Sequence, residues 1–458
     1  MSKFLTILFF LFNMAPLFSF DLPVSRISDD SLLRLRLSEA WMIESPVRVL
    51  SQAPRIELLE TGEKVRISTM EGREEFRVLF SRELIRGTSV TERRGTGQFP
   101  GWAQGSWMLT RRKDTGAPTQ IRIFLRSDEN THIQFRPFNS ENCWLDVVLY
   151  GGYVARSIPI GVPFERLYTM RLNDILRLAD NKFPIRYFEP DAANYRDARR
   201  LTANIRSRLG ELRYADDGAF DENGNLVFIE TLGDQNSQTA GVNCSGFIKW
   251  LIDGILRPVT GERLAITPLK KPFGERGSSF TVNWEESRDV FFGLDWIRNL
   301  AAEANDVLRT YNRRHGAGVS AFRNLDEFEV RADNFAYIIV NENRSFVTQS
   351  FPGFLHESGY GVEGLYPLLY TLAIDEPFTF YLGAVNSEIG TPGAPRGTPR
   401  LRQYHHLAAF IPFFDENGNF RIAVFESAVE TSINRFRSRN SGRQVNLVKI
   451  PITPGFDP

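Results

Sequence analysis

Cys244 has the best setting for chemistry in this 458-residue chain. It follows a loop rich in Gly, Asn, Gln, Ser and Thr, 233–241, and precedes an apolar run. From Phe247 the apolar residues recur with the spacing of one helical face, and Pro258 is expected to end the helix. Cys244 would then lie in the first turn, where free N–H groups and the helix dipole lower the pKa of a thiol. We expect a nucleophile; a buried structural cysteine is the alternative.

A cysteine nucleophile needs a base within hydrogen-bond reach, and that base needs an orienting group. His405 and His406 open an apolar run that predicts a buried strand. Successive strand residues face opposite sides of a sheet, so only one of the two is expected to face Cys244. His356, followed by Glu357 in a Gly-rich loop, is the rival base. A surface loop is the other interpretation of that segment.

The run Asn243-Cys244-Ser245-Gly246-Phe247-Ile248 resembles the Asp-Cys-Ser-Gly-Phe-Val signature of the NlpC/P60 papain-like cysteine peptidases. In that family the Cys opens a helix packed on an antiparallel sheet. The partner His starts a strand of the form His-Val-Gly-Ile-Tyr, and His406-Leu407-Ala408-Ala409-Phe410 is similar in register. The resemblance therefore implies His406 as the base, with His405 as its neighbour.

The resemblance also implies the other site residues. A polar third residue stands on the family's next strand before a small residue, a place that Glu426 fits, so Glu426 would hold the far nitrogen of the imidazole. Tyr214, which follows a predicted helix over 192–212, matches a tyrosine near the family's active site. Tyr214, Ser245 and Asn243 are expected to bind substrate or to form the oxyanion site.

Two departures from the family pattern stand out. The resemblance covers about 195–256 and 375–430, and Asn243 replaces the usual Asp beside the nucleophile. The nucleophile and the base are separated by far more chain than in compact members of the family. We therefore predict an inserted subdomain at about 258–375.

The preceding sequence predicts two further parts. A short helix with Ser28 as its N-cap is predicted within 21–45. From Pro46, β-formers alternate with turn signals, which predicts an all-β domain, a sandwich or barrel, over 46–165. The catalytic domain would occupy 166–458. The predicted fold class is α+β: a papain-like NlpC/P60 catalytic domain, with a helix packed on an antiparallel sheet, preceded by an all-β domain.

The phrase Phe-Asp-Glu-Asn-Gly-Asn occurs twice, at 220–225 and at 414–419, each time before a β-run. Asn-Gly between apolar runs predicts a hairpin turn. The spacing also resembles a calcium loop, but the terminal Glu of the twelve-residue pattern is missing. The sequence contains no zinc motif, P-loop or dinucleotide glycine pattern, so no metal and no cofactor is expected.

The composition and the N-terminal segment limit where the protein is expected to act and which partners it is expected to bind. The 55 basic and 55 acidic residues give no net charge, which argues against a nucleic-acid binder. Residues 1–20 carry Lys3 and an apolar run and predict a secretory signal peptide, hence a periplasmic or secreted protein; an uncleaved anchor is the alternative. Export would permit a disulfide between Cys143 and Cys244, although a free Cys244 is expected.

These inferences predict an exported cysteine hydrolase that cleaves an amide bond. By the habit of the family it resembles, the substrate would be a stem peptide of cell-wall peptidoglycan. The β domain would hold the enzyme on the wall or on a protein partner of the cell envelope. Two alternatives remain open at the level of sequence. One is an inactive peptidase-fold binding or scaffold protein, and the other is a Cys-His acyltransferase or amidase for another substrate.

Overall fold

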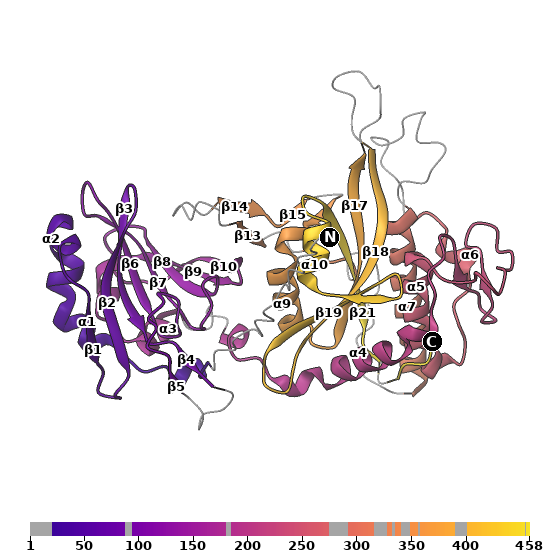
Figure 1. Cartoon of the computed structure of the whole chain (residues 1–458), viewed down its shortest axis with the longest axis horizontal. Helices are drawn as coiled ribbons and strands as arrows, with labels where there is room; N and C mark the ends of the chain where they lie inside the picture. The colour runs from indigo at the N-terminus through magenta and orange to yellow at the C-terminus, as the bar shows by residue number, and fades with distance from the viewer. Residues whose placement is uncertain are drawn as a thin grey trace, which may run out of the picture. The chain divides into compact units, whose positions relative to one another are not determined.

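The computed structural model describes residues 21–87, 94–179, 185–273, 292–315, 328–331, 335–339, 349–355, 358–389, 401–453 and 455–458. The chain forms two compact units (Figure 1). The first comprises the chain up to Tyr150 together with Ala155–Glu189, and the second comprises Gly151–Val154 and Pro190–Pro458. The predicted signal peptide and the rival base His356 lie outside the described residues. Among the helices that the structure describes, none is long and apolar enough to cross a membrane.

The first unit is built on an antiparallel meander in the order β1–β2–β3–β6–β7–β8–β9–β10, in which the first residues of β10, up to Val154, are assigned to the second unit. The strands are β1 Arg55–Leu58, β2 Lys64–Glu71, β3 Glu75–Arg82, β6 Trp107–Arg112, β7 Pro118–Ile123, β8 His132–Pro137, β9 Cys143–Leu149 and β10 Gly152–Pro159. A separate small hairpin pairs β4 Ile85–Arg86 with β5 Arg94–Gly95. Large aromatic side chains on the meander, among them Trp107, Phe76 and Phe135, are buried. This sheet agrees with the strand pattern predicted from the sequence.

Helices complete the first unit. A helix was predicted within 21–45, whereas the prediction of an all-β domain over 46–165 missed the helices at 46–50 and 164–168. The helices are η1 Val24–Arg26, α1 Ser31–Ser38, η2 Glu39–Ile43, α2 Pro46–Leu50, η4 Phe164–Tyr168, α3 Leu172–Ala179 and η6 Ile185–Tyr187. Pro46 starts a helix instead of a strand, because proline suits the first helical position. The N-cap of α1 is Asp30, not Ser28 as predicted.

The segment 21–45 is part of the first unit and not a separate part. Buried Arg34 of α1 pairs with Asp30 at 2.8 Å and donates to the carbonyl oxygens of Leu167 (3.3 Å) and Met170 (2.7 Å). A buried guanidinium needs such partners to offset its lost hydration. These bonds join α1 to the segment at 167–170, so the unit extends beyond residue 165 to Glu189.

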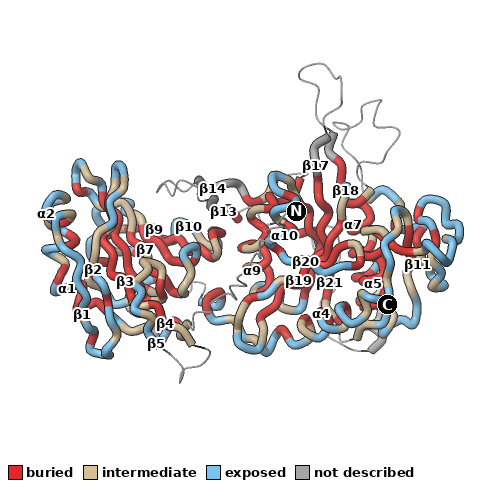
Figure 2. The backbone as a smooth tube through the Cα atoms, in the orientation of Figure 1, coloured by how far each residue is buried: buried red, intermediate tan, exposed pale blue. Residues whose placement is uncertain are grey.

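The second unit contains a seven-stranded antiparallel sheet in the order β15–β16–β21–β17–β18–β19–β20. The strands are β15 Phe354–Leu355, β16 Gly359–Gly361, β17 Thr379–Ile389, β18 Leu401–Phe414, β19 Phe420–Glu426, β20 Val429–Thr431 and β21 Gln444–Pro451. Figure 2 shows the middle of β17 and β18 as buried. Helices must therefore cover this sheet, because a strand with one wet face would alternate between buried and exposed residues.

The helices of this unit are η7 Ala192–Tyr195, α4 Arg196–Arg208, η8 Leu209–Glu211, α5 Cys244–Thr260, α6 Ile266–Leu269, α7 Phe292–His315, η10 Val362–Gly364, α9 Leu365–Asp375 and α10 Ile433–Arg439. Helices α5 and α7 pack on each other and on β18, and α7 also contacts β17 and β21. Helices α4 and α9 contact β18 as well. The second unit is thus a helix-covered antiparallel sheet.

The described parts of 258–375 do not form the inserted subdomain that we predicted. Helix α7 lies on the main sheet, where its apolar residues Leu294, Trp296 and Ile297 are buried. Strands β15 and β16 extend the same sheet. Strand β13, Ala336–Ile339, pairs with β14, Gln349–Pro352, and with the start of β10 at Gly152 and Tyr153. Burial of apolar faces draws this stretch into the existing layers.

Helix α5 passes Pro258 and ends at Thr260, although the sequence predicted an end at the proline. Proline has no N–H, so the carbonyl of Gly254 loses its partner within the helix. The backbone N–H of Asp457 donates to that carbonyl at 2.7 Å. Gly261, with φ of 79°, then ends the helix in the left-handed conformation.

Both copies of the repeated phrase form hairpin turns, as predicted. The first joins β11, Ala219–Phe220, to β12, Leu226–Val227. The carboxylate of Asp221 accepts from the N–H of Asn225 at 2.7 Å, and that of Asp415 accepts from Asn419 at 2.9 Å. Each acid thus satisfies its own turn, and within the described chain no cluster of His, Cys, Asp and Glu has the arrangement of a metal site.

Candidate active site

Cys244 is the first residue of α5, where the sequence predicted it. Asn243 is the N-cap, and its Oδ1 accepts from the N–H of Gly246 at 2.8 Å. The N–H of Phe247 donates to the carbonyl of Asn243 at 2.9 Å. Within the described chain, no acceptor bonds the N–H of Cys244 or that of Ser245. Two donors at the positive end of the helix are thus left beside the sulfur.

Glycine is required two positions after Cys244. A Cβ on Gly246 would lie 1.9 Å from the carbonyl oxygen of Gly218, well inside van der Waals contact. The N–H of Asn243 donates to the same carbonyl at 3.1 Å. The segment before β11 therefore lies directly against the first turn of α5 and fixes the position of the cysteine.

A β-bulge places the two histidines of β18. His406 pairs with Val385 of β17 and Tyr404 pairs with Asn386, so His405 is the extra residue. The ring centroids of the two histidines lie 6.4 Å apart. The bulge interrupts the regular alternation on which we based the expectation that only one of the two faces Cys244.

Of these two histidines, His406 is the one near Cys244. Its side chain is near enough to the sulfur of Cys244 to lower the pKa of that thiol, and its Nε2 lies 2.6 Å from Oε2 of Glu426, which leaves Nδ1 for the sulfur. His405 is exposed, and its Nε2 accepts from Arg443 at 2.6 Å. The predicted Cys244, His406 and Glu426 are thus brought together in one chain of contacts.

Glu426 ends β19 and is buried. The turn to β20 uses Ser427 and Ala428, with φ of 47° and 64°. Positive φ at both central positions belongs to the tight hairpin turn that matches strand twist, and it strains residues other than glycine. The second oxygen of Glu426, Oε1, accepts a hydrogen bond from the guanidinium of Arg439 on α10.

The contacts shift the ionisation of this group. Burial by itself raises the pKa of Cys244, but the hydrogen bond and charge of His406 and the N–H of Leu407 outweigh it, and the pKa is lowered. Burial lowers the pKa of His406, whereas its bonds to Cys244 and Glu426 raise it to about 9. Burial raises the pKa of Glu426, but His406 and Arg439 bring it below its usual value. Together these shifts favour a thiolate–imidazolium pair near neutral pH.

The remaining predicted residues surround the sulfur in different ways. Tyr214 is exposed and is bonded to the side chain of Asp216; burial, Asp216 and the nearby charge of Cys244 raise its pKa. The hydroxyl of Ser245 makes a smaller contribution than His406 to the lowered pKa of Cys244. Asn243, predicted for substrate binding or the oxyanion site, instead directs its oxygen to the cap, and its Nδ2 donates to the carbonyl of Asp216 at 3.3 Å.

Sequence reasoning missed two supports of the site. One is Arg439, the partner of Glu426. The other is Trp296 of α7, whose Nε1 donates to the carbonyl of Ser245 at 3.0 Å. The helix that carries Arg439, α10, could have been predicted from the sequence, because Ser432 is a typical N-cap residue. Its hydroxyl accepts from the N–H of Arg435 at 3.2 Å. Trp296 had no such local signal, since only the placement of α7 brings it near the cysteine.

Both cysteines are free thiols in the structure. Cys143 is buried in β9 of the first unit, where burial and then Glu165 raise its pKa to about 11. It is therefore a poor nucleophile near neutral pH. The two thiols differ in the direction of their pKa shifts, which allows them to be distinguished chemically.

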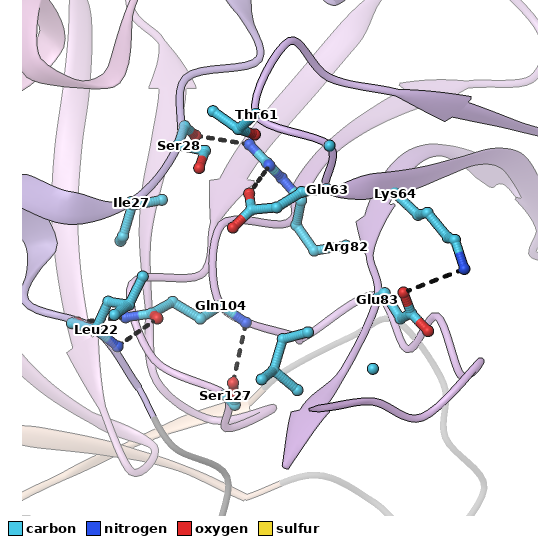
Figure 3. A pocket seen from close by; sticks show the side chains of 13 residues that line it. Leu22, Ile27, Ser28, Thr61, Glu63, Lys64, Arg82, Glu83, Gln104 and Ser127 are labelled. Carbon is cyan, nitrogen blue, oxygen red and sulfur yellow. Dashed lines mark hydrogen bonds and ion pairs between the residues drawn. The ribbon is translucent and has the colours of Figure 1, made fainter. Parts of the chain in front are cut away.

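A pocket in the first unit is lined by Arg82, Glu63, Lys64, Glu83, Gln104 and others (Figure 3). Its polar side chains are largely bonded to one another. Arg82 donates to Glu63 at 2.8 Å and to the carbonyl of Ser28 at 2.7 Å, and Gln104 bonds both backbone groups of Leu22 at 2.7 Å. None of the predicted site residues lines this pocket.

The class of fold is α+β, with antiparallel sheets in both units. One family model, described as a domain of unknown function (DUF8515), matches residues 23–187. The match ends close to Glu189, the end of the first unit, and does not reach Cys244. No curated protein and no solved structure matches the chain.

Proposed function

We propose that the protein is a cysteine hydrolase with Cys244 as nucleophile and His406 as base. The observation that carries the proposal is the chain of contacts from Cys244 through His406 to Glu426, built at the N-terminus of a helix. Nucleophile, base and orienting group are the three parts that such catalysis requires. A cysteine retained only for packing would not need a buried carboxylate behind its histidine partner.

The geometry supports the following reaction. The thiolate of Cys244 attacks the carbonyl carbon of an amide, and the oxyanion is held by the N–H groups of Cys244 and Ser245. The His406 imidazolium gives its proton to the leaving amine as the carbon–nitrogen bond breaks. Water then loses a proton to His406 and attacks the thioester, which releases a carboxylic acid and restores the thiolate. Glu426 keeps the imidazole oriented through both steps.

The resemblance to the NlpC/P60 papain-like peptidases supports the same assignment at the level of fold. A helix that begins with the nucleophile packs on an antiparallel sheet, and one strand of that sheet carries the base. Because Asn243 acts as the helix cap, the replacement of the usual Asp by Asn is a weaker reason to suspect a catalytically inactive protein. Asparagine and aspartate cap helices about equally well, so this departure leaves the local geometry intact.

We further propose peptidoglycan stem peptides as the substrate and the periplasm or cell exterior as the location. The predicted signal peptide and the resemblance support both parts. The first unit would then hold the enzyme on the wall or on a partner in the envelope. An acyltransferase or an amidase with another substrate would use the same residues, and the products distinguish it from a peptidase.

The test is release of soluble fragments from purified peptidoglycan, followed by mass spectrometry. The wild-type protein should release stem fragments, and Cys244→Ala should lose all release. Cys143→Ala is the matched control and should retain activity, because that thiol lies in the other unit. Release that persists in Cys244→Ala, or no release by the wild type, would contradict the proposal.

A further inference from the structure

We propose that Arg439 is a positioning residue of this site, which keeps Glu426 ionised and aligned so that His406 presents one ring nitrogen to Cys244. The inference deepens the proposed function and rests on it. Arg439 does not touch the reacting sulfur; it acts through Glu426. The sequence resemblance implied three catalytic residues and three residues for substrate binding or the oxyanion site, and Arg439 is not among them.

The two oxygens of Glu426 have different partners. Oε2 lies 2.6 Å from Nε2 of His406, and Oε1 bonds the guanidinium of Arg439. A carboxylate bound at only one oxygen can rotate about its last torsion angle, whereas one bound at both oxygens is fixed in plane. The bond from Arg439 therefore fixes the plane of the Glu426 carboxylate, and the carboxylate in turn fixes the orientation of the His406 ring.

Charge balance gives Arg439 a second role. The thiolate, the imidazolium and the carboxylate together carry one net negative charge, and the guanidinium makes the sum zero. Glu426 is buried, and an uncompensated negative charge is costly there. Without the cation the carboxyl would bind a proton more readily, and a neutral carboxyl stabilises imidazolium less.

Arg439 lies on the short helix α10, which is anchored to the sheet. The strained turn at Ser427 and Ala428 reverses the chain after Glu426, and α10 follows β20. Phe436 of α10 is buried, and its ring meets Phe410 of β18 edge to face at 5.1 Å. Arg439 lies one helical turn after Phe436, on the same side of the helix. The anchor on β18 thus holds the guanidinium near the strand that carries the base.

Other charged or titratable groups lie near the site and are unchanged in the proposed variants. Tyr214 and Asp216 stand before β11, and His405 with Arg443 stands beside the base. Burial first, and then Arg443, lowers the pKa of His405, so it is neutral near pH 7. A shift measured on changing Arg439 therefore reports the loss of that one cation.

The experiment follows alkylation of Cys244 by iodoacetamide in the full chain, across pH, with the labelled peptide identified by mass spectrometry. Arg439→Met should move the acid limb of the rate profile upward by roughly 0.5–1 pH unit, since the guanidinium is half exposed and partly screened. On that limb the rate should fall by about 3- to 10-fold. Arg439→Lys, which keeps the charge, should stay close to the wild type.

Arg435→Met is the matched control, because Arg435 is an exposed residue of the same helix, and its profile should be unchanged. If the Met variant does not fold, Arg439→Gln removes the charge and keeps a donor. A profile of the neutral variant that superimposes on the wild type, or that falls equally at every pH, overturns the inference. An ordinary thiol profile in the wild type overturns it together with the proposed function. If alkylation shows a lowered pKa for Cys244 in the wild type but no fragments are released from peptidoglycan, only the proposed function is overturned.

Discussion

The two ring nitrogens of His406 face two different groups, a thiol and a carboxylate. Nδ1 is left for the sulfur of Cys244, and Nε2 meets Glu426 at 2.6 Å. The carboxylate stabilises the protonated ring, and the protonated ring stabilises the thiolate. At the scale of single residues, the site therefore depends on one imidazole being charged while the neighbouring thiol is not protonated.

A bell-shaped dependence of hydrolysis on pH follows from these shifts. The pKa of Cys244 is lowered, so the thiolate forms below the usual thiol range, and this sets the acid limb. The pKa of His406 is raised to about 9, so the imidazolium is lost above that pH, and this sets the alkaline limb. Measurement of kcat/KM against pH on a soluble stem peptide should show both limbs.

His406→Ala separates the two contributions. Without the imidazolium, the alkylation midpoint of Cys244 should rise to that of an ordinary thiol, roughly 8.5, or above it because of burial. His405→Ala is the control and should leave the midpoint nearly unchanged, since His405 bonds Arg443 and not the sulfur. Equal profiles for His406→Ala and the wild type would refute the assignment of the base.

Helix α5 is the element that the second unit is built around. It begins at Cys244, contacts β18 and α7, and is covered at its start by the segment that leads into β11. Its carbonyl at Gly254, left free by Pro258, is satisfied by the C-terminal segment at Asp457. Both ends of the helix thus depend on chain segments that are distant in sequence.

Gly246→Ala should destabilise the second unit by roughly 2 kcal/mol or more, because the new methyl group cannot fit beside the carbonyl of Gly218. Urea unfolding measures the loss. Gly210→Ala is the matched control, since nothing lies within 4 Å of a Cβ built there. It should change the free energy of unfolding by less than about 0.5 kcal/mol. Equal stability of both variants would contradict the close approach seen at Gly246.

At the scale of the whole molecule, the first unit has a core of its own, and a family model covers nearly the same residues, 23–187. Its strands pair mainly with their neighbours in sequence, which favours autonomous folding. The predicted site lies entirely in the second unit. The family match and the predicted site therefore fall in different units of one chain.

The fragment 21–189 should fold by itself. We expect a single cooperative urea transition with a free energy of unfolding of about 5–15 kcal/mol, the usual range for a domain. It should also show no hydrolytic activity, because Cys244 is absent. The full-length protein serves as the reference for both measurements. A fragment without a cooperative transition would show that the first unit needs the rest of the chain.

Local chemistry allowed much of this to be predicted from the sequence. The two Asn-Gly turns, the helix that begins at Cys244 and most strands of the first unit depend on backbone preferences and on patterns within a few residues. The placement of Cys244 beside His406 and Glu426 was predicted only through the resemblance, since no local pattern joins residues so far apart in the chain.

Tertiary structure decided the rest. The bulge that makes His405 an extra residue comes from the pairing of β17 with β18, and the cap role of Asn243 depends on where α5 begins. Likewise, α7 joined the main sheet, and Arg439 reached Glu426, only because distant apolar surfaces had to be buried together. A sequence states which faces are apolar, but the pairing of those faces is a property of the whole fold.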